Sequence, residues 1–440
     1  MNFVVTTLRP SVKQALRLAA LLAASGCVRA PAGSPAPGPL AAAPGPAQSP
    51  DGGAARREPS VPTLSAPAAA DLEALRPLLA RGPAFLARDP DAGPNARITL
   101  VARTAASPER LRGVIANPAE YPSFMPILNG VEMISTRGSR QAFRFHVAAP
   151  VFDVTALCNL HQVSERRVDV AITQSEAGPG VSRWDFNAEP DGGTLFSLAT
   201  WGDPSQGHWI LRQVARRSPT AVAGMNIAVG SVLALGAMRR AEILSGQSLP
   251  VRPSEGVADA GPLAPPPPGP WLWLSHEQAV VSMKLRADGA IEQVTVASYT
   301  QAAPDLVLRR LREVSNYPRI WGSFRSVDVQ PPAAGEGEDN VRFQSHVQTA
   351  LTRLDGEQRM RVEGNTVWHE GVSGDFAGSS HRWDIVADPA GGTVVLLTGG
   401  SDMNRAGTLT RVLIGMDPWL AVGFAGSWKI VWLRNFLRAV

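Results

Sequence analysis

The sequence RWDFNAEPDGGT at residues 183–194 recurs as RWDIVADPAGGT at residues 382–393. Both stretches contain Arg-Trp-Asp, an acidic residue before proline, and Gly-Gly-Thr in the same order, at an offset of 199 positions. Solenoid repeats recur every ~20–50 residues, so a period of this length is the size of a whole domain. The pattern therefore predicts a tandem duplication of one domain.

The similarity continues upstream of this stretch. SPERLRGVIANPAEYP at residues 107–122 aligns with APDLVLRRLREVSNYP at residues 303–318, at an offset of 196. Two of the three tyrosines of the chain, Tyr121 and Tyr317, fall on the shared Tyr-Pro pair. Arg144-Phe145 aligns with Arg342-Phe343 at an offset of 198. A slowly drifting offset indicates small insertions in loops between two copies of one fold.

Charge and length narrow the class of protein. A chain of 440 residues is long enough for two or three domains, and its formal charge is +4. Three of the positive charges lie in the first 26 residues, which contain no acid. The remaining 39 basic and 38 acidic residues nearly cancel. We therefore expect no nucleic-acid partner, because the basic surface that such binding needs is missing.

The N-terminus has the pattern of an export signal. Basic residues precede a short apolar run, residues 18–24, which is followed by Ser25-Gly26-Cys27. This ending resembles a bacterial lipobox, although Ala24 stands where leucine is usual. Residues 1–27 are thus predicted to be a signal peptide with lipidation of Cys27, and an ordinary signal cut nearby is the alternative. The resemblance implies a lipid-anchored protein of the bacterial cell envelope that faces the periplasm, at the outer membrane in preference to the inner.

The rest of the chain divides by composition. Residues 28–70 are rich in Pro, Ala and Gly and are predicted to be a disordered linker. Residues 71–246 form the first domain, residues 247–270 a Pro-rich linker, and residues 271–440 the second domain. The linker predicts two units that fold independently. Cys158 lies in an apolar stretch and is expected to be a small buried hydrophobe.

Each copy follows the same order of elements. A strand hairpin comes first, at residues 84–104 and again at residues 279–299, where Asp288-Gly289 is a hairpin turn signal. Ser107-Pro108 opens a helix, because serine caps a helix and proline fits its first position. Alternating strands follow, and a long apolar helix closes each copy, at residues 221–244 and 418–437.

This element order resembles the START-like, or SRPBCC, superfamily, which includes polyketide cyclases and coenzyme Q-binding proteins of the Coq10 type. In the first copy, the resemblance rests on Ser107-Pro108, residues 117–126 and residues 238–242. In the second copy, it rests on Ala303-Pro304 and residues 314–318. The resemblance implies an α+β class with tandem helix-grip domains, each a curved antiparallel sheet wrapped around a long C-terminal helix. It also implies an apolar cavity for lipids, isoprenoids or polyketides.

The candidate ligand-binding residues follow from this resemblance. The two tyrosines would lie at the cavity mouth, and the alternative is that they plug the core behind a helix end. Alternating aromatic residues could line the pocket or could simply pack the sheet on the helix. Arg183 with Asp185 is expected to be an ion pair on one face and not a catalytic pair. The candidate set is Tyr121, Phe124, Phe143, Phe145, Trp184, Phe186, Gly230, Ala234, Tyr317, Phe343 and Trp383.

Three classes of function compete. The first is a non-catalytic carrier or sensor of a hydrophobic ligand, the second an interaction or scaffold module with closed cavities, and the third an enzyme of the cyclase or dehydratase type. No metal-ligand spacing, nucleophile elbow or phosphate loop occurs in the sequence, so no metal and no cofactor are expected. A protein partner is not indicated.

The two closing helices differ in side-chain size. The first carries small residues, and the second carries Trp428, Trp432 and Phe436 four residues apart. Small side chains facing a curved sheet would leave space for an apolar ligand. The first domain is thus predicted to hold the more open pocket. The small residues are Gly224, Ala228, Gly230, Ala234, Gly236 and Ala237.

Overall fold

The structure is a computed structural model that describes residues 62–148, 153–246, 263, 270–286, 291–331, 339–348, 353–400, 412, 414–417 and 419–440. The predicted signal peptide with Cys27 and residues 28–61 of the first predicted linker lie outside the described residues, as does almost all of the linker 247–270.

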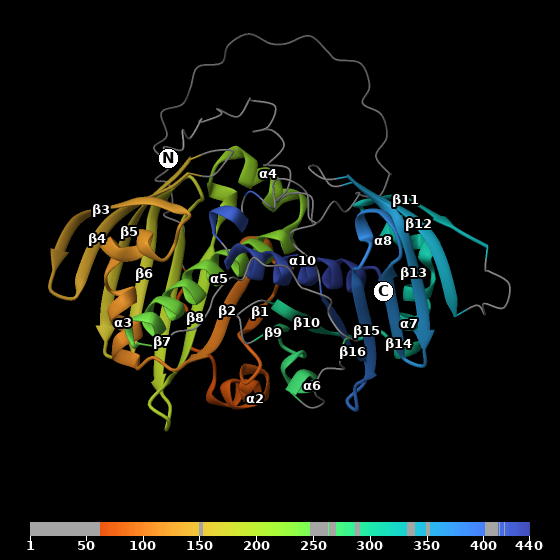
Figure 1. Cartoon of the computed structure of the whole chain (residues 1–440), viewed down its shortest axis with the longest axis horizontal. Coiled ribbons are helices and arrows are strands. Elements are labelled where there is room, and N and C mark those ends of the chain that lie inside the picture. Colours follow the sequence, from red (N-terminus) through yellow and green to blue (C-terminus); the bar gives the residue numbers. More distant parts are fainter. Residues whose placement is uncertain are drawn as a thin grey trace, which may run out of the picture.

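A single antiparallel sheet of sixteen strands runs through both copies of the repeat (Figure 1). Its order is β11-β12-β13-β14-β15-β16-β10-β9-β1-β2-β8-β7-β6-β5-β4-β3. The strands of the first copy are β1 (Ala84–Arg88), β2 (Arg97–Thr104), β3 (Leu128–Arg137), β4 (Arg140–Ala148), β5 (Asp153–Ser164), β6 (Arg167–Ser175), β7 (Gly180–Ala188) and β8 (Thr194–Gly202). Those of the second are β9 (Ala279–Leu285), β10 (Ile291–Thr300), β11 (Phe324–Val329), β12 (Asn340–Gln348), β13 (Arg353–Glu363), β14 (Thr366–Gly371), β15 (Ser380–Ala387) and β16 (Thr393–Gly400).

Helices cover both faces of this sheet. The inner face carries the two long closing helices, α5 (Pro219–Leu244) and α10 (Trp419–Arg438), together with shorter ones. The shorter helices are α3 (Pro108–Ile115), η2 (Pro118–Ser123), α4 (Trp209–Arg217), α7 (Pro304–Arg312), η4 (Val314–Asn316) and α8 (Tyr317–Ile320). The outer face carries α2 (Ala69–Leu79) and α6 (Pro270–Leu274), which pack over its centre through Leu75, Leu78, Val101, Leu274 and Val280. The remaining short turns are η1 (Gly93–Asn95), η3 (Pro204–Gln206) and η5 (Gly374–Phe376).

The two copies join edge to edge at β1 and β9. These strands pair antiparallel, with Phe85 opposite Val281 and Leu86 opposite Val280. The pairing satisfies backbone groups that would otherwise be left open at a sheet edge. The described elements of each copy fall within residues 71–246 and 271–440 apart from the start of α2 and of α6, and the domain boundaries themselves stay predictions.

The closing helices pack closely against each other over the inner face. A Cβ added at Gly423 would lie 2.5 Å from the Cα of Ala228, and one added at Gly224 would lie 3.3 Å from the Cβ of Ser427. Gly224 and Gly423 are 199 residues apart, as are Ala228 and Ser427. The contact is thus pseudo-two-fold, and a glycine followed four positions later by a small residue allows the backbones to approach.

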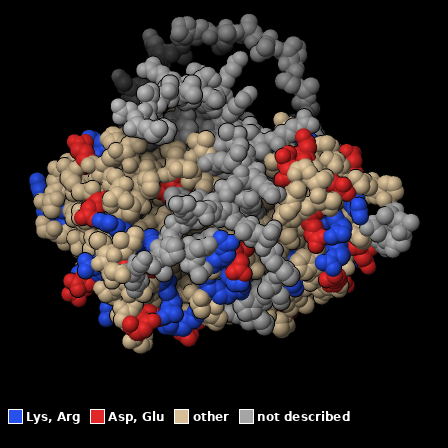
Figure 2. Space-filling view, viewed as in Figure 1, with Lys and Arg blue, Asp and Glu red and all other residues tan. Residues whose placement is uncertain are grey.

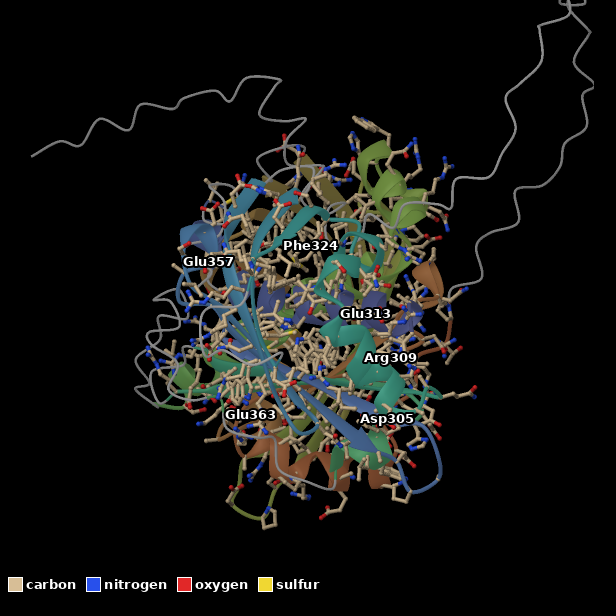
Figure 3. All side chains as sticks on the ribbon, turned by 90° about the vertical axis from the view of Figure 1, so that its right-hand side faces the viewer. Asp305, Arg309, Glu313, Phe324, Glu357 and Glu363 are labelled. Atoms are coloured by element: carbon tan, nitrogen blue, oxygen red, sulfur yellow. The ribbon has the colours of Figure 1, made fainter. Side chains whose placement is uncertain are left out.

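The local sequence accounts for the helix ends. The Ser107 side chain accepts a hydrogen bond from the backbone N–H of Arg110, and Pro108 is the first residue of α3. On α7, Asp305 and Arg309 lie on the exposed side and Glu313 follows the last helical residue (Figure 3), whereas Val307 and Leu311 are buried. Helix α5 has the length and hydropathy of a membrane span, but 72% of its most apolar window is buried inside the protein.

The surface agrees with the near-neutral charge balance. Acidic and basic side chains are interspersed over the face shown in Figure 2. The hairpins, the first helix of each copy and the closing helices lie where the sequence predicts them. Strand β3, helix α4 and the continuous sheet were not predicted from the sequence.

Candidate functional site

Both repeat tyrosines are buried, and the hydroxyl of each reaches back to the C-terminal end of the preceding long helix, α3 or α7. Tyr121 donates its hydroxyl to the carbonyl of Ile115 at 2.6 Å, and Tyr317 donates to the carbonyl of Leu311 at 2.7 Å. Each ring also lies edge-on to a phenylalanine of the inner face, Phe143 or Phe343, at 5.9 and 6.0 Å between centroids. Burial raises the pKa of both phenols, so each stays a neutral donor. The tyrosines therefore plug the core behind a helix end.

Strand register corrects one alignment of the repeat. Phe143 pairs with Cys158 on β5, and Phe343 pairs with Gln358 on β13, so Phe343 is the counterpart of Phe143. The counterpart of Phe145 is accordingly Ser345, because one loop insertion precedes β12. Cys158 is buried, as predicted, and burial raises the pKa of its thiol to about 12.

A hydrogen-bonded chain crosses the interior of the second copy. Trp383 donates from Nε1 to Nδ1 of His369 at 3.1 Å, and Nε2 of His369 lies 2.7 Å from the Tyr317 hydroxyl. Since Nδ1 accepts and the tyrosine proton goes to Leu311, Nε2 of His369 carries the proton and donates to Tyr317. Burial lowers the pKa of His369 to about 3, which keeps the ring neutral. Every member of the chain thus has a partner.

Aromatic rings fill the rest of that interior. Trp432 stacks on Trp428 at 4.5 Å and lies 5.3 Å from Trp321 and 5.6 Å from Trp383. The Trp321 indole N–H donates to the carbonyl of Trp432 at 2.9 Å, and Phe436 lies 5.4 Å from Trp383. Such packing leaves the inner face of the second copy covered by its closing helix.

Two further ionisable side chains are buried in this packing. Lys429 has 0% exposure, and His381 lies edge-on to Trp432 at 5.1 Å. A Cβ added at Gly399 would lie 2.4 Å from Nδ1 of His381, so the glycine makes room for the imidazole. Burial lowers the pKa of Lys429 to about 7 and that of His381 well below its usual range.

The first copy has smaller residues at the equivalent positions. At an offset of 199, His369 corresponds to Val170, His381 to Ser182, Lys429 to Gly230, Trp432 to Leu233 and Phe436 to Ala237. Val170, Ser182 and Leu233 are partly exposed, whereas their counterparts are buried. A Cβ added at Gly230 would meet no described atom within 4 Å.

These residues form what we call the inner apolar surface. It lies between β4–β7 and the middle of α5, and its members are partly exposed except for Gly230, which is buried beside open space. Two positions run the other way, because Phe145 and Ile172 are larger than their counterparts Ser345 and Gly371. The inner apolar surface consists of Phe145, Val170, Ile172, Ser182, Gly230 and Leu233.

The structure divides the predicted site residues between this surface and the closed core. Phe145 and Gly230 belong to the surface. In the second copy, Tyr317, Phe343 and Trp383 are buried in the filled interior. The predicted residues of the first copy that lie in its closed end are Tyr121, Phe143, Trp184, Phe186 and Ala234, with Phe124 partly buried against them.

Sequence reasoning missed Val170, Ile172, Ser182 and Leu233. A comparison of side-chain size at the offset of 199 would have identified three of them, since each faces a large residue in the other copy. The expectation that all small residues of α5 face the sheet is wrong. Gly224 and Ala228 pack on α10, and a Cβ at Gly236 would lie 3.2 Å from the carbonyl oxygen of Phe124.

The Arg-Trp-Asp motif has a structural role on the outer face. Arg183 holds Asp185 through two hydrogen bonds of 2.7 and 2.8 Å, as the sequence predicts. It also donates to the carbonyl of Leu64 at 3.1 Å, and in the second copy Arg382 donates to the carbonyl of Leu263 at 3.4 Å. The motif thus fastens the segment that precedes each copy onto that copy's own sheet.

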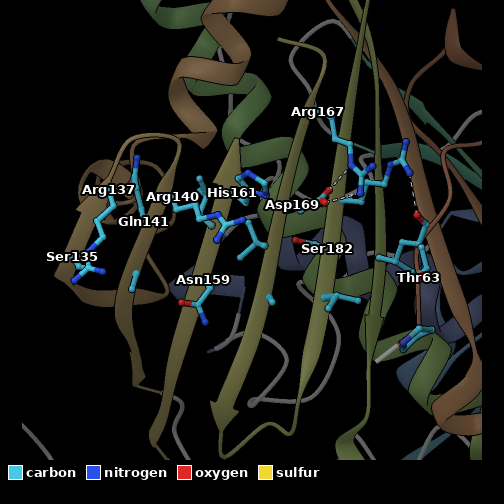
Figure 4. Close-up of a pocket in the computed structure, with 18 residues that line it drawn as sticks. Thr63, Ser135, Arg137, Arg140, Gln141, Asn159, His161, Arg167, Asp169 and Ser182 are labelled. Carbon is cyan, nitrogen blue, oxygen red and sulfur yellow. Dashed lines mark hydrogen bonds and ion pairs between the residues drawn. The ribbon is translucent and has the colours of Figure 1, made fainter. Parts of the chain in front are cut away.

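The outer face of the first copy also carries a cavity of about 630 Å³. It lies over β3–β7, and the segment from Pro62 to Leu64 forms one wall (Figure 4). Residues that face outward from five successive strands meet there. In strand order these are Arg137, Arg140, His161, Asp169 and Arg183.

No protein-family model and no curated protein matches this chain. Solved structures do. The di-domain ARO/CYC StfQ from the steffimycin biosynthetic pathway is 12% identical, with 78% of this chain and 99% of that chain covered and a TM-score of 0.25. A START superfamily protein from Mycobacterium smegmatis is 17% identical over 34% of this chain and 98% of its own, with a TM-score of 0.28.

A STAR-related lipid transfer protein from Xanthomonas axonopodis is 13% identical over 38% of this chain and 94% of its own, with a TM-score of 0.29. TM-scores this low carry no argument about function. The fold assignment rests on the antiparallel sheet of each copy and on the long helix that closes it. The chain has an α+β architecture in two tandem copies, each an antiparallel sheet closed by a long helix, which is the arrangement that the sequence resemblance to START-like proteins implies.

Proposed function

We propose that the first copy binds a hydrophobic molecule, of the lipid, isoprenoid or polyketide class, on its inner apolar surface, and acts as a carrier or sensor. One observation carries this proposal. At equivalent positions the second copy buries His369, His381, Lys429 and Trp432, whereas in the first copy Val170, Ser182 and Leu233 are partly exposed and Gly230 is a glycine beside open space. Apolar surface that a protein leaves uncovered in its interior gains free energy when an apolar ligand covers it.

Binding without catalysis fits the chemistry of the surface. Phe145, Val170, Ile172 and Leu233 are apolar, and Ser182 and Gly230 contribute no group that titrates near neutral pH. General acid or base catalysis needs a titratable side chain within reach of the substrate. The second copy fits a scaffold role, since its interior is filled and it shares both a strand edge and a helix contact with the first.

Export and lipid anchoring at the envelope are part of the proposal. They rest on the apolar run at residues 18–24 and on Ser25-Gly26-Cys27. Two acyl chains hold a protein at a membrane more firmly than one. The variant C27S is expected to appear in the soluble periplasmic fraction, and its retention on membranes would contradict the lipid anchor.

The binding proposal is tested with a neutral fluorescent probe and by native mass spectrometry. The probe, Nile red, is expected to bind the full chain with one site per molecule. The variant L233W, which copies Trp432 of the second copy, is expected to weaken this binding at least tenfold. The variant G113W places the same side chain on the exposed side of α3 and serves as the control. Equal binding by L233W and the wild type would contradict the proposal.

A further inference from the structure

The cavity on the outer face is basic at one end. Arg137 on β3 lies directly opposite Arg140 on β4, and Arg140 lies directly opposite His161 on β5. Residues directly opposite on antiparallel strands have Cβ atoms about 4.5–5.5 Å apart. Figure 4 shows these three labelled side chains following one another across neighbouring strands.

The acidic side chains of the cavity are already paired. Arg167 holds Asp169 through hydrogen bonds of 2.8 and 2.6 Å, and Arg183 holds Asp185. Within the part of the chain that the structure describes, the side chains of Arg137, Arg140 and His161 make no hydrogen bond or ion pair. Like charges directly opposite each other on a sheet are destabilising, and a shared anion would relieve that repulsion.

The second copy lacks this arrangement. By strand register, Asn340 corresponds to Arg140, Arg361 to His161, and Trp368 to Asp169. The Trp368 ring lies under two guanidinium groups, 5.5 Å from Arg361 and 5.1 Å from Arg382, and Arg361 is paired with Glu363. The equivalent surface is therefore occupied by an indole and neutralised by an acid.

We propose that this outer cavity binds the phosphate group of an organic phosphate, held by Arg137, Arg140 and His161. Two guanidinium forks and an imidazole offer more N–H donors than the two oxygens of a carboxylate can accept with good geometry, whereas a phosphate monoester presents three acceptor oxygens. A volume of about 630 Å³ is several times larger than one phosphate. The remaining lining would hold the organic part of the ligand and includes Leu64, Ala142, Ala171 and Val181.

The side chains proposed to hold the phosphate lie on the opposite face of the sheet from the inner apolar surface, although Val170 and Ser182 of that surface also border the cavity. A ligand with both a phosphate and an apolar chain could not reach both through the paired strands. The phosphate proposal and the hydrophobic-ligand proposal are tested with different probes, so a negative result for one does not contradict the other.

The test is equilibrium binding at physiological ionic strength with the full chain. The first arm titrates glycerol 3-phosphate, and the second measures cosedimentation with phosphatidic acid vesicles against neutral phosphatidylcholine vesicles. The variant R137Q/R140Q is expected to bind at least about tenfold more weakly than the wild type. The control, R97Q/R166Q, removes the same charge from two exposed positions of the first copy outside the cavity lining and is expected to stay within about twofold of the wild type.

Each outcome of these binding experiments either supports or overturns the phosphate proposal. Binding of glycerol 3-phosphate that only R137Q/R140Q loses supports a site for soluble organic phosphates. Binding of phosphatidic acid vesicles alone, with the same dependence on variants, supports a lipid headgroup as the source of the phosphate. Absence of binding in both arms, or equal losses in the two variants, overturns the proposal. Thermal melting of each variant confirms that the fold is retained.

Discussion

Gly230 and Lys429 occupy equivalent positions on the two closing helices, 199 residues apart, and both are buried. No described atom lies within 4 Å of a Cβ added at Gly230, whereas the Lys429 side chain is fully buried and lies near enough to His381 to help lower the pKa of that imidazole. The two copies therefore share one fold but differ in how far side chains fill the space between the sheet and the closing helix. The copy that keeps the glycine is the one whose inner face stays partly exposed.

The close contact between α5 and α10 predicts that replacing glycine with alanine has opposite effects on stability at Gly423 and at Gly230. G423A places a methyl group 2.5 Å from the Cα of Ala228, which must move, so we expect a loss of about 1–3 kcal/mol in the free energy of unfolding. G230A meets no described atom within 4 Å and replaces a helical glycine, so we expect a gain of up to about 1 kcal/mol. Urea unfolding of the two variants measures both, and a loss of stability in G230A comparable to that in G423A would contradict this account of the helix contact.

Replacing each repeat tyrosine with phenylalanine is expected to lower the free energy of unfolding by a different amount. Y121F removes a single hydrogen bond to Ile115 and is expected to cost about 0.5–1.5 kcal/mol. Y317F also strands the buried N–H of His369, which adds about 1–3 kcal/mol for an unsatisfied donor. Chemical unfolding of the full chain compares them. Equal costs would show that the chain from Trp383 through His369 to Tyr317 contributes nothing.

Because Lys429 is buried, we expect the free energy of unfolding to increase with pH. Its pKa is lowered to about 7 by burial, against 10.5 for the free side chain. Between these two values the unfolded chain binds a proton that the folded protein does not, so the free energy of unfolding increases as pH rises from about 7 toward 10.5. K429M removes this group at similar volume and is expected to flatten that part of the profile. His381 and His369 face the same interior, but burial lowers their pKa values below this range. A profile identical to that of the wild type would contradict the assignment.

The shared sheet predicts that the separated halves associate. Residues 62–246 alone would expose the edge of β1, and residues 270–440 alone would expose the edge of β9. Both would also expose the glycine contact between α5 and α10. Coexpressed halves are expected to copurify as a one-to-one complex that melts at a higher temperature than either half. Two monomeric halves with the melting temperature of the full chain would instead support fully independent units.

The repeated sequence made the fold of each copy predictable. The pairing of the two copies into one sheet could not be predicted, for a physical reason. The stretch at residues 183–194 and its repeat predict two equivalent domains, and alternation along residues 181–188 predicts a strand with Trp184 and Phe186 on one face. Pairing between β1 and β9 uses only backbone groups, which carry no sequence signature. The loop insertion before β12 likewise concealed the equivalence of Phe143 and Phe343 until strand register was known.

The candidate site was only partly predictable. Aromatic residues such as Trp184 and Phe186 attract attention in a sequence, yet they pack the closed end of the domain. The residues that stay partly exposed, Val170 and Leu233, are ordinary aliphatics whose role depends on what the sheet and α5 leave uncovered. Comparison with the filled second copy, and not residue type, identifies them.

The central claim is that the first copy binds a hydrophobic molecule where the second is filled. Its most direct measurement is Nile red titration of G230W together with thermal melting, with G113W as the matched control on the exposed side of α3. The account predicts that G230W abolishes probe binding while its melting temperature stays within a few degrees of the wild type, and that G113W binds as the wild type does. Undiminished binding by a folded G230W, or a large loss of stability in a chain whose wild type never bound the probe, would contradict it.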